Sequence, residues 1–535
     1  MTTSALNSPT ATGLPDPAVV ARLANELFAA LPGHPQDAVP QAPASEPFNA
    51  SGVPGAQSLP ADANLPASSW PGSDLRALPA SLNIPSPDRA LAGFYFLDGA
   101  QGEPAPAQPG LDSHAFDLGP VPGLDLAPRP FDPHAVRRDF PILQERVHGK
   151  PLVWLDNGAT TQKPQAVIDR LSHYYEHENS NIHRAAHELA ARSTDAYEGA
   201  REKVRRFLNA STAKEIVFVR GTTEGINLIA KSWGHRYVGK DDEIVITWLE
   251  HHANIVPWQQ LCAEKGAVLR VAPVNDNGEV ILEEYEKLLN ERTKLVSLTH
   301  VSNALGTITP AKEMVAMAHR HGARVLVDGA QSVPHMRIDV QDLDCDWFVF
   351  SGHKMVAPTG IGAVYGKLDL LDETPPWQGG GNMIVDVTFE KTVYHDAPAR
   401  FEAGTGNIAD AVGLGAAIDY LERVGMENIG HYEHVLLAYA TGALRQVPGL
   451  RIYGNAREKA GVLSFTLAGF ESEEVGKALD REGIAVRAGH HCAQPILRRF
   501  GLESTVRASL ALYNTCEDID ALAAALLKIR ASRGG

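Results

Sequence analysis

Residues 347–354 read Trp-Phe-Val-Phe-Ser-Gly-His-Lys, an apolar run that ends in a polar turn and a lysine. The run is typical of a buried strand, so the pattern places Lys354 at the mouth of that strand. Lysine is costly to desolvate, and partial burial lowers its pKa. The neutral amine is a nucleophile toward aldehydes. A lone lysine after a strand is more often a solvated loop residue, so the rest of the chain has to decide between the two interpretations.

The same pattern extends on both sides of this run. From Phe131 onward, short apolar stretches alternate with helical patterns such as residues 310–321. These stretches are residues 215–219, 243–247, 294–298, 324–327 and 347–350. Strands that alternate with helices predict an α/β domain with a mostly parallel sheet. Ligands of such sheets bind at the carboxyl ends of the strands, so we expect the chemistry there.

The bulk composition excludes several classes of protein. The chain has 535 residues, enough for several domains, and its net charge of −16 argues against a nucleic-acid-binding protein. No apolar run approaches the roughly 18 residues of a membrane span. The N-terminus lacks a basic region followed by an apolar one, so no secretory signal is expected. Four widely spaced cysteines are no disulfide framework and suit a reducing cytoplasm.

Residues 1–130 differ in composition from the rest of the chain. They hold 22 of the 36 prolines, no lysine, and 12 acidic residues against 4 arginines. Such a segment cannot bury enough apolar surface to offset its ordering entropy, so we expect a disordered N-terminal extension. Apolar islands at residues 16–31, 91–97 and 114–118 interrupt it, and the first has the pattern of a capped amphipathic helix. Such islands favour docking onto a partner; packing against the chain's own domain and an inert linker are the alternatives.

Polar groups follow each predicted strand. Asp328 comes directly after residues 324–327, where it could cap the next helix or hold a protonated ring nitrogen. Residues 220–225, Arg-Gly-Thr-Thr-Glu-Gly, offer free backbone N–H groups, two hydroxyls and a helix N-terminus. This combination suits a phosphate ligand. An ordinary threonine N-cap of the following helix is the alternative interpretation. The segment lacks a Walker lysine and the dinucleotide glycine spacing. Residues 250–254 and 300–306 add histidine and asparagine at two more strand ends.

One ligand fits this set of strand ends. It carries a phosphate, a ring cation that pairs with an aspartate, a planar face for an imidazole, and an aldehyde for a lysine. Pyridoxal 5'-phosphate (PLP) has all four, and it acts as an electron sink for carbanions at an amino-acid α-carbon.

The motifs DGAQ (328–331), SGHK (351–354), RGTTEG (220–225) and EHHAN (250–254) resemble the class V, fold type I PLP enzymes. Within that class the chain is most similar to the Suf-type, or group II, cysteine desulfurases, over about 400 residues from Phe131 to the C-terminus. The resemblance implies the α/β fold of a fold type I PLP-dependent transferase. It also implies a large domain of about residues 160–410 with a mostly parallel sheet, and a smaller α+β domain from about residues 131–159 and 411–535.

The resemblance implies a role for each matching residue. Lys354 would bond the cofactor aldehyde, Asp328 would pair with the pyridine nitrogen, and Gln331 would contact the ring hydroxyl. His251 would stack on the ring. The residues implied to hold the phosphate are Thr222, Thr223, Ser351, His353 and, reaching from the other subunit of a homodimer, Thr405. The substrate carboxylate would bind Asn303 and Arg507, which suits the bidentate fork of arginine. The family motif has proline after the threonine, where this chain has Gly406.

Cys492 is the residue that decides between the reactions open to PLP. It lies in residues 486–495, Val-Arg-Ala-Gly-His-His-Cys-Ala-Gln-Pro, where Arg487 and two histidines can lower a thiol pKa. A buried inert cysteine and a zinc site with His490 and His491 are the alternatives. The segment resembles the desulfurase active-site loop, which implies that Cys492 is the nucleophile, that His251 assists at the substrate thiol, and that no metal is needed.

The resemblance also bears on substrate and partners. It implies conversion of L-cysteine to L-alanine with a persulfide on Cys492, and a sulfur acceptor of the SufE or SufU type; a selenocysteine lyase would use many of the same residues. The extension is similar in composition to the cargo-loading regions of desulfurases packaged in encapsulin shells, which predicts a cytoplasmic protein inside such a compartment. The alternatives are an unpackaged Suf desulfurase for Fe–S cluster assembly whose tail tethers an acceptor, and a non-catalytic scaffold, which the intact motifs disfavour.

Overall fold

The computed structural model describes residues 131–183 and 186–533. The prediction of a disordered extension, and of docking motifs within it, falls on residues 1–130 and lies outside the described residues. In the described part, no helix combines the length and the apolar character that crossing a membrane requires.

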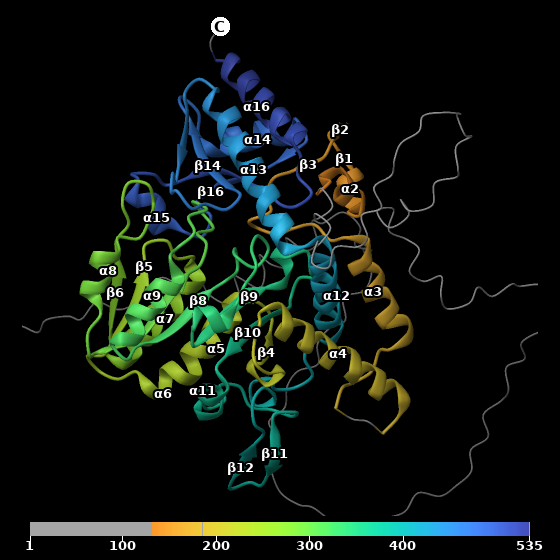
Figure 1. Ribbon diagram of the computed structural model, residues 1–535, viewed down its shortest axis with the longest axis vertical. Helices are drawn as coiled ribbons and strands as arrows, with labels where there is room; N and C mark the ends of the chain where they lie inside the picture. The colour runs from red at the N-terminus through yellow and green to blue at the C-terminus, as the bar shows by residue number, and fades with distance from the viewer. Residues whose placement is uncertain (1–130, 184–185, 534–535) are drawn as a thin grey trace, which may run out of the picture. The chain divides into compact units, whose positions relative to one another are not determined.

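A seven-stranded sheet forms the centre of the described structure (Figure 1). Its strands, in spatial order, are β4 (Ile216–Val219), β10 (Gly362–Gly366), β9 (Trp347–Ser351), β8 (Arg324–Asp328), β7 (Thr293–Thr299), β5 (Glu243–Thr247) and β6 (Val268–Ala272). All run in one direction except β10, which pairs antiparallel with both β4 and β9. The predicted α/β fold with a mostly parallel sheet is therefore confirmed, and all five predicted apolar runs are strands of this sheet.

Apart from the edge strand β6, which is largely exposed, the sheet is buried on both faces, which explains why its strands are mostly apolar without alternation. In β9, Trp347 and Val349 join one apolar cluster with residues of the helices α5 and α7, while Phe348 and Phe350 join the cluster on the opposite face, which includes residues of α9 and α12. The helices that accompany the sheet are α3 (Gln165–His177), α4 (Glu188–Phe207), α5 (Thr222–Ile229), α6 (His235–Tyr237), α7 (Val256–Lys265), α8 (Leu282–Leu288), α9 (Ala311–Arg320), α10 (Val340–Leu343), α11 (Leu368–Glu373) and α12 (Ile408–Val424). The helix predicted at residues 310–321 is α9.

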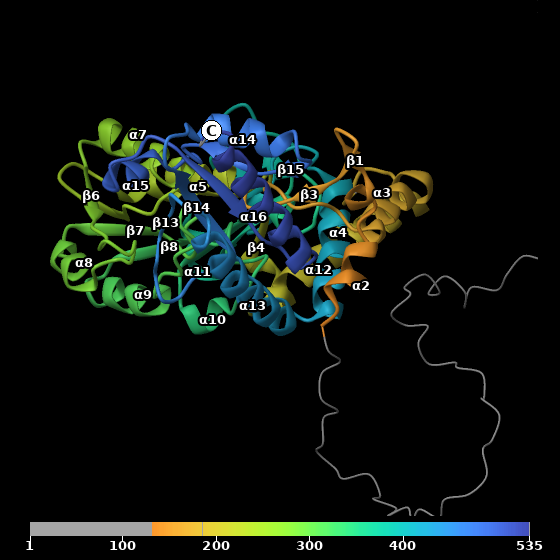
Figure 2. The same cartoon turned by 90° about the horizontal axis from the view of Figure 1, so that it is seen from above.

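A second, four-stranded antiparallel sheet lies beyond the carboxyl ends of the large one. It consists of β13 (Leu450–Tyr453), β14 (Val462–Leu467), β17 (Thr505–Ser509) and β16 (Arg487–Gly489). Its helices are α13 (Met426–Arg445), α14 (Ser472–Asp480) and α16 (Cys516–Ala531), and Figure 2 shows α13 beside α16. A chain segment from before the large sheet joins this part, because β3 (Val153–Trp154) pairs with β15 (Ile484–Ala485). The predicted boundaries between a large and a small domain stay a prediction.

The remaining elements are short. They are α2 (Pro133–Arg138), β1 (Arg146–Val147), β2 (Lys150–Pro151), α15 (Gln494–Arg499) and the hairpin of β11 (Ile384–Val387) and β12 (Thr392–Tyr394), which projects at the foot of Figure 1. The connection from β16 to α15 matters most for function, since it carries Cys492 toward the carboxyl ends of the large sheet.

Candidate active site

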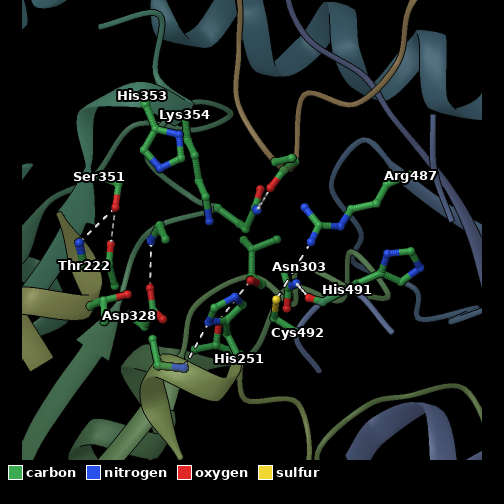
Figure 3. A pocket seen from close by; sticks show the side chains of 18 of the residues that line it. Thr222, His251, Asn303, Asp328, Ser351, His353, Lys354, Arg487, His491 and Cys492 are labelled. Carbon is green, nitrogen blue, oxygen red and sulfur yellow. Dashed lines mark hydrogen bonds between the residues drawn. The ribbon is translucent and has the colours of Figure 1, made fainter. Parts of the chain in front are cut away.

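A pocket of about 180 Å³ lies where the carboxyl ends of the parallel strands face β16 and β17 (Figure 3). Its lining includes every predicted site residue except Thr405: Thr222, Thr223, His251, Asn303, Asp328, Gln331, Ser351, His353, Lys354, Cys492 and Arg507. These residues come from five strand ends and from the smaller sheet, over almost 300 residues of sequence. The structure therefore brings together side chains that the sequence could only place one at a time.

Lys354 extends from the turn after β9 into this pocket (Figure 3). The pKa of its amine is lowered to about 8, mainly by burial and also by the charges of Arg507 and Arg487, while Asp328 and Cys492 oppose the shift. Near neutral pH a minority of the amine is then uncharged, which is the form that attacks an aldehyde and accepts a proton. The loop interpretation of Lys354, in which the amine is freely solvated, is wrong.

The carboxylate of Asp328 lies at the end of β8 and is buried. Burial raises its pKa, while a hydrogen bond from the Ala330 backbone N–H (2.9 Å) and the charge of Lys354 oppose that rise. A buried carboxylate with so few partners is suited to a cationic ligand atom. Gln331 also lines the pocket, but its side-chain nitrogen donates to the Gly158 carbonyl oxygen at 2.7 Å.

The turn from β4 into α5 forms the other end of the pocket. The Thr222 backbone N–H donates to the Ser351 hydroxyl oxygen at 2.9 Å, and that hydroxyl donates in turn to Oγ1 of Thr222, also at 2.9 Å. Gly221, with φ of +151°, brings the backbone close, and a Cβ there would lie 3.0 Å from Oγ of Ser351. Hydroxyls and backbone N–H groups at a helix N-terminus make this end suitable for a phosphate.

His251 lies after β5, on the wall of the pocket opposite Lys354 (Figure 3). Its Nδ1 accepts a hydrogen bond from the Ala253 backbone N–H at 3.0 Å, so a hydrogen on the ring belongs on Nε2. Burial lowers the pKa of His251 to about 3, with smaller contributions from the charges of Lys354, His252, Arg487 and Arg507. The ring is therefore neutral at physiological pH.

Arg507 and Asn303 lie on one side of the pocket. The Arg507 guanidinium is almost fully buried; it donates to Oδ1 of Asp156 and to the Asn303 carbonyl oxygen, both at 3.0 Å, while its Nε has no partner. The Asn303 side-chain nitrogen donates to the His491 carbonyl oxygen at 2.6 Å, and its Oδ1 has no partner. Unpaired buried polar atoms on both residues point to a missing polar ligand. Asp156 is a neighbour that the sequence alone did not identify.

Cys492 lies in a strained turn between β16 and α15. Its φ is +55° and that of His491 is +54°, so two consecutive residues other than glycine occupy the left-handed region. The thiol lies 3.9 Å from Nη2 of Arg487. The two side chains lie next to each other in Figure 3. The Cys492 carbonyl accepts from the His252 backbone N–H at 2.8 Å. Strained backbone conformations of this kind cluster at functional sites.

The alternatives for Cys492 do not match this geometry. Its side chain is half-exposed in the pocket, so it is not an inert core cysteine. His490 accepts from the Cys492 backbone N–H and His491 bonds the Thr505 hydroxyl, and no cluster of three possible metal ligands occurs among residues 131–183 and 186–533. Burial raises the pKa of Cys262 to about 11 and also raises that of Cys345. Cys516 is exposed at the start of α16 and does not line the pocket.

Thr405 does not line this pocket. It borders two neighbouring cavities, one of them about 400 Å³ and lined also by Arg220, Glu224 and Trp377. Its predicted contact reaches the phosphate of the other subunit of a homodimer, so that contact stays a prediction.

The pocket fits PLP. Asp328 supplies a buried anion, the helix start at Thr222 supplies phosphate donors, and Lys354 supplies a half-buried amine of lowered pKa between them. When bound, PLP provides the electron sink that stabilises a carbanion at the substrate α-carbon.

The family model described as aminotransferase class-V matches residues 153–522. The chain therefore belongs to the class V aminotransferase family, and the predicted enzyme class and the PLP cofactor are confirmed.

Individual relatives agree with the family. The chain is 67% identical over 459 residues to the cysteine desulfurase of Synechococcus elongatus, which covers 84% of this chain and 73% of the relative. It is 66% identical to probable cysteine desulfurase 1 of Mycobacterium leprae, over 73% of this chain but only 64%, less than two thirds, of that relative. Among solved structures, the cysteine desulfurase CsdA of Escherichia coli has a TM-score of 0.70 at 38% identity, covering 75% of this chain and 99% of its own. The apo structure of the cysteine desulfurase from Thermococcus onnurineus has a TM-score of 0.71 at 38% sequence identity, and the match covers 74% of this chain and 98% of that one.

Proposed function

We propose that this protein is a PLP-dependent cysteine desulfurase of the Suf-type group, which converts L-cysteine to L-alanine and keeps the sulfur as a persulfide on Cys492. The observation that carries the proposal is the placement of Cys492 and Lys354 in one pocket, with the thiol 3.9 Å from Nη2 of Arg487. The names of the relatives in Synechococcus and Mycobacterium support the same activity.

Substrate binding is assigned to Arg507 and Asn303. The unpaired Nε–H of Arg507 and the second amide hydrogen on Nδ2 of Asn303 would donate to the substrate carboxylate, which would lie beside the Arg507–Asp156 pair. Among the residues that line the pocket, Asp328 would pair with the positive charge on the cofactor ring, and Thr222, Thr223, Ser351 and His353 would hold its phosphate. His251 would stack on the ring.

Proton transfer is assigned to Lys354, and His251 would assist at the substrate thiol. The Lys354 amine would remove the substrate α-proton and later return a proton to the carbon skeleton, while bound PLP would supply the electron sink for that chemistry. The neutral His251 ring, whose Nδ1 accepts from the Ala253 backbone N–H and whose hydrogen is on Nε2, would assist at the substrate thiol by donating a hydrogen bond from Nε2 to its sulfur atom.

The sulfur transfer itself occurs at Cys492. Its thiolate, beside the Arg487 cation, attacks the substrate sulfur atom, so that an S–S bond forms as the Cβ–S bond breaks. The electron pair of the broken bond stays on the carbon skeleton, which takes up a proton and leaves as L-alanine. The Cys492 persulfide retains the sulfur, so atoms and charges balance without an external oxidant.

Two variants test the assignment. Cys492→Ala is expected to keep the visible absorbance of bound PLP but to release no alanine or sulfide from L-cysteine. Lys354→Ala is expected to lose the absorbance of the lysine-bound cofactor. Normal sulfide release by the cysteine variant would overturn the desulfurase mechanism, and faster turnover of L-selenocysteine with unaffected Cys492→Ala activity would favour the selenocysteine lyase.

The acceptor and the oligomeric state are part of the same proposal. We assign the sulfur to a SufE- or SufU-type acceptor and the enzyme to a homodimer in which Thr405 reaches the phosphate of the partner's cofactor. Sedimentation of the holoenzyme tests the dimer. The rate of alanine formation tests the acceptor, because a true acceptor accelerates turnover well beyond that with a small-molecule reductant.

We further assign residues 1–130 to docking inside an encapsulin shell. The Synechococcus match covers 84% of this chain, more than the segment from Phe131 to the C-terminus, so it extends into the extension and supports a shared role for it. Co-expression of a shell protein with the full chain and with a chain that begins at Phe131 tests this. Equal loading of both would rule out the extension as the address and favour a tether for the acceptor or for Fe–S cluster assembly.

A further inference from the structure

The carbonyl oxygen of His353, the residue before Lys354, accepts an unusual number of hydrogen bonds. The donors come from one short segment that precedes α3. They are the Thr161 backbone N–H at 3.0 Å, Oγ1 of Thr160 at 2.9 Å, Oγ1 of Thr161 at 3.2 Å and Nζ of Lys163 at 3.1 Å. A carbonyl oxygen has two lone pairs, so two of these donors would satisfy it. The surplus indicates that this segment does more than fill a hydrogen-bonding requirement.

The same segment also holds the other side of the lysine-bearing turn. Oγ1 of Thr161 accepts a hydrogen bond from the Val356 backbone N–H at 2.8 Å. Val356 has φ of +59°, a conformation that is costly for a β-branched residue and that persists only when its surroundings enforce it. Lys354 therefore lies between two backbone contacts, at His353 and Val356, that both depend on residues 160–163.

Lys163 is the unexpected member of this segment. Its ammonium donates to the carbonyl oxygens of Thr161 (2.5 Å) and His353, and no ion pair is found for it in the described part of the chain. Burial lowers the pKa of Lys163 to about 8, so it remains mostly charged at neutral pH without an anion beside it. Burying a cation with carbonyl partners only is costly, and a neutral donor would have served the carbonyl as well.

The charge of Lys163 is felt inside the pocket. The pKa of His353 falls to about 4, first because of burial and then because of the charges of Lys354 and Lys163. His353 therefore stays neutral beside the phosphate end of the pocket. Lys163 does not line the pocket, so it acts on the site through the His353 backbone and through its charge.

We propose that Lys163 is a positioning residue for the cofactor lysine: with Thr160 and Thr161 it fixes the His353 carbonyl, and with it the backbone from which Lys354 extends. The proposal rests on the assignment of Lys354 as the residue that bonds PLP. Residues 160–163 then act as a support that the N-terminal part of the catalytic domain supplies to the turn after β9.

The test compares three folded holoenzymes. Lys163→Met removes the charge and keeps most of the side-chain length, and Lys163→Arg keeps the charge. Lys459→Met is the matched control: Lys459 is also half-buried, donates only to carbonyl oxygens (those of Leu305 and Gly454, at 2.5 and 2.6 Å), and has a pKa lowered to about 7 by burial. It supports a different turn of the chain.

Two readouts besides activity are measured, the affinity for PLP and the pH midpoint of the visible absorbance of the lysine-bound cofactor. Because the protonated form of that bond is cationic, removing a nearby cation favours it and raises the midpoint. Lys163→Met is expected to raise the midpoint by about 0.5 pH unit or more and to weaken PLP binding about tenfold. Lys163→Arg is expected to restore the midpoint, and Lys459→Met to leave both quantities as in the wild type.

Unchanged midpoint and affinity in Lys163→Met, or equal changes in Lys459→Met, would overturn the proposal. If Lys163→Met does not fold, Thr160→Val replaces it, because this variant removes one hydrogen-bond donor to the His353 carbonyl. It is expected to weaken PLP binding a few-fold and to leave the pH midpoint of the visible absorbance unchanged. Wild-type PLP affinity in Thr160→Val would count against the proposal. Borohydride reduction of the wild type, followed by peptide mapping, separates the two assumptions. Cofactor found on another lysine would overturn the assignment of Lys354 itself.

Discussion

Removing the Asn303 side chain should release the strained turn that carries Cys492. Asn303→Ala deletes the buried 2.6 Å bond to the His491 carbonyl oxygen. The other bonds that hold the turn are those from the His252 backbone N–H to the Cys492 carbonyl and between His491 and the Thr505 hydroxyl. Asn303 therefore has a second role beside the one predicted from the sequence, because it connects the substrate site to the nucleophile.

The magnitude follows from two contributions that both favour opening of the turn. The left-handed conformations of His491 and Cys492 cost about 1 kcal/mol each or more, so the turn is inclined to open. Leaving the buried His491 carbonyl without its donor costs a further ~1–3 kcal/mol in the closed turn. Since about 1.4 kcal/mol corresponds to a factor of ten, the open population should rise roughly tenfold or more.

Native-state hydrogen exchange measures this population directly. The informative amide hydrogens are those of His252 and Ala493, which bond the carbonyl oxygens of Cys492 and His490. In Asn303→Ala they should exchange about tenfold faster, while those of β14 keep their wild-type rates. Ser464→Ala serves as the control, because Ser464 donates to the neighbouring Ala304 carbonyl and does not contact the turn. Wild-type exchange rates in Asn303→Ala, or equally accelerated exchange in Ser464→Ala, would show that the Asn303 side chain does not hold the turn closed.

Three further predictions concern the scaffold around the site. Arg201→Met breaks the buried ion pair with Glu402 (2.6 Å), and urea denaturation should show a free energy of unfolding lower by about 3–5 kcal/mol. Adding Glu402→Gln should recover part of this loss, because the carboxylate is then no longer buried without its partner. A loss below ~1 kcal/mol in Arg201→Met would contradict the prediction. Burial raises the pKa of Glu250 to about 8 in the folded protein, so the protonated side chain contributes stability that is fully present below its unfolded pKa and is lost as pH rises toward 8. The unfolding free energy of the wild type, relative to that of Glu250→Gln, should therefore fall across that pH range. A difference that stays constant with pH would contradict the raised pKa. Gly329→Ala would place a Cβ 2.0 Å from Cζ of Phe348. We expect it to lower the free energy of unfolding by about 1–3 kcal/mol and to weaken PLP binding by displacing the adjacent Asp328, with partial recovery in a Phe348→Leu background. Wild-type stability and PLP affinity in Gly329→Ala would contradict this prediction.

Much of the fold could be predicted from the sequence because its strands carry local signals. Residues 244–246 and 347–350 are continuous apolar runs, as expected of strands buried on both faces, and each is followed by residues that cannot be buried without a partner. β6 and β10 were not among the predicted runs. The sequence of β10, Gly-Ala-Val-Tyr-Gly, is short, and its pairing depends on close packing, since a Cβ at Gly362 would lie 2.3 Å from the Phe350 carbonyl oxygen.

The site could be predicted only as far as its motifs reach. Lys354, Asp328 and Cys492 follow recognisable strand ends or loops, and the structure places them in one pocket. Asp156 and Lys163 gave no such signal, because their roles depend on the Arg507 guanidinium and the His353 carbonyl, about 350 and 190 residues further along the chain. Contacts between residues so far apart are determined by tertiary structure, which one sequence does not reveal.

We propose that Cys492 receives the substrate sulfur in the pocket that contains Lys354 and would hold PLP. The mass of the Cys492 peptide tests this transfer after a single turnover of the holoenzyme with L-cysteine, without acceptor or reductant and with alkylation of persulfides. We expect this peptide to gain one sulfur atom in stoichiometry with the L-alanine formed, and the Cys262, Cys345 and Cys516 peptides to gain none. Alanine formed without sulfur on Cys492, or sulfur on another cysteine, would contradict it.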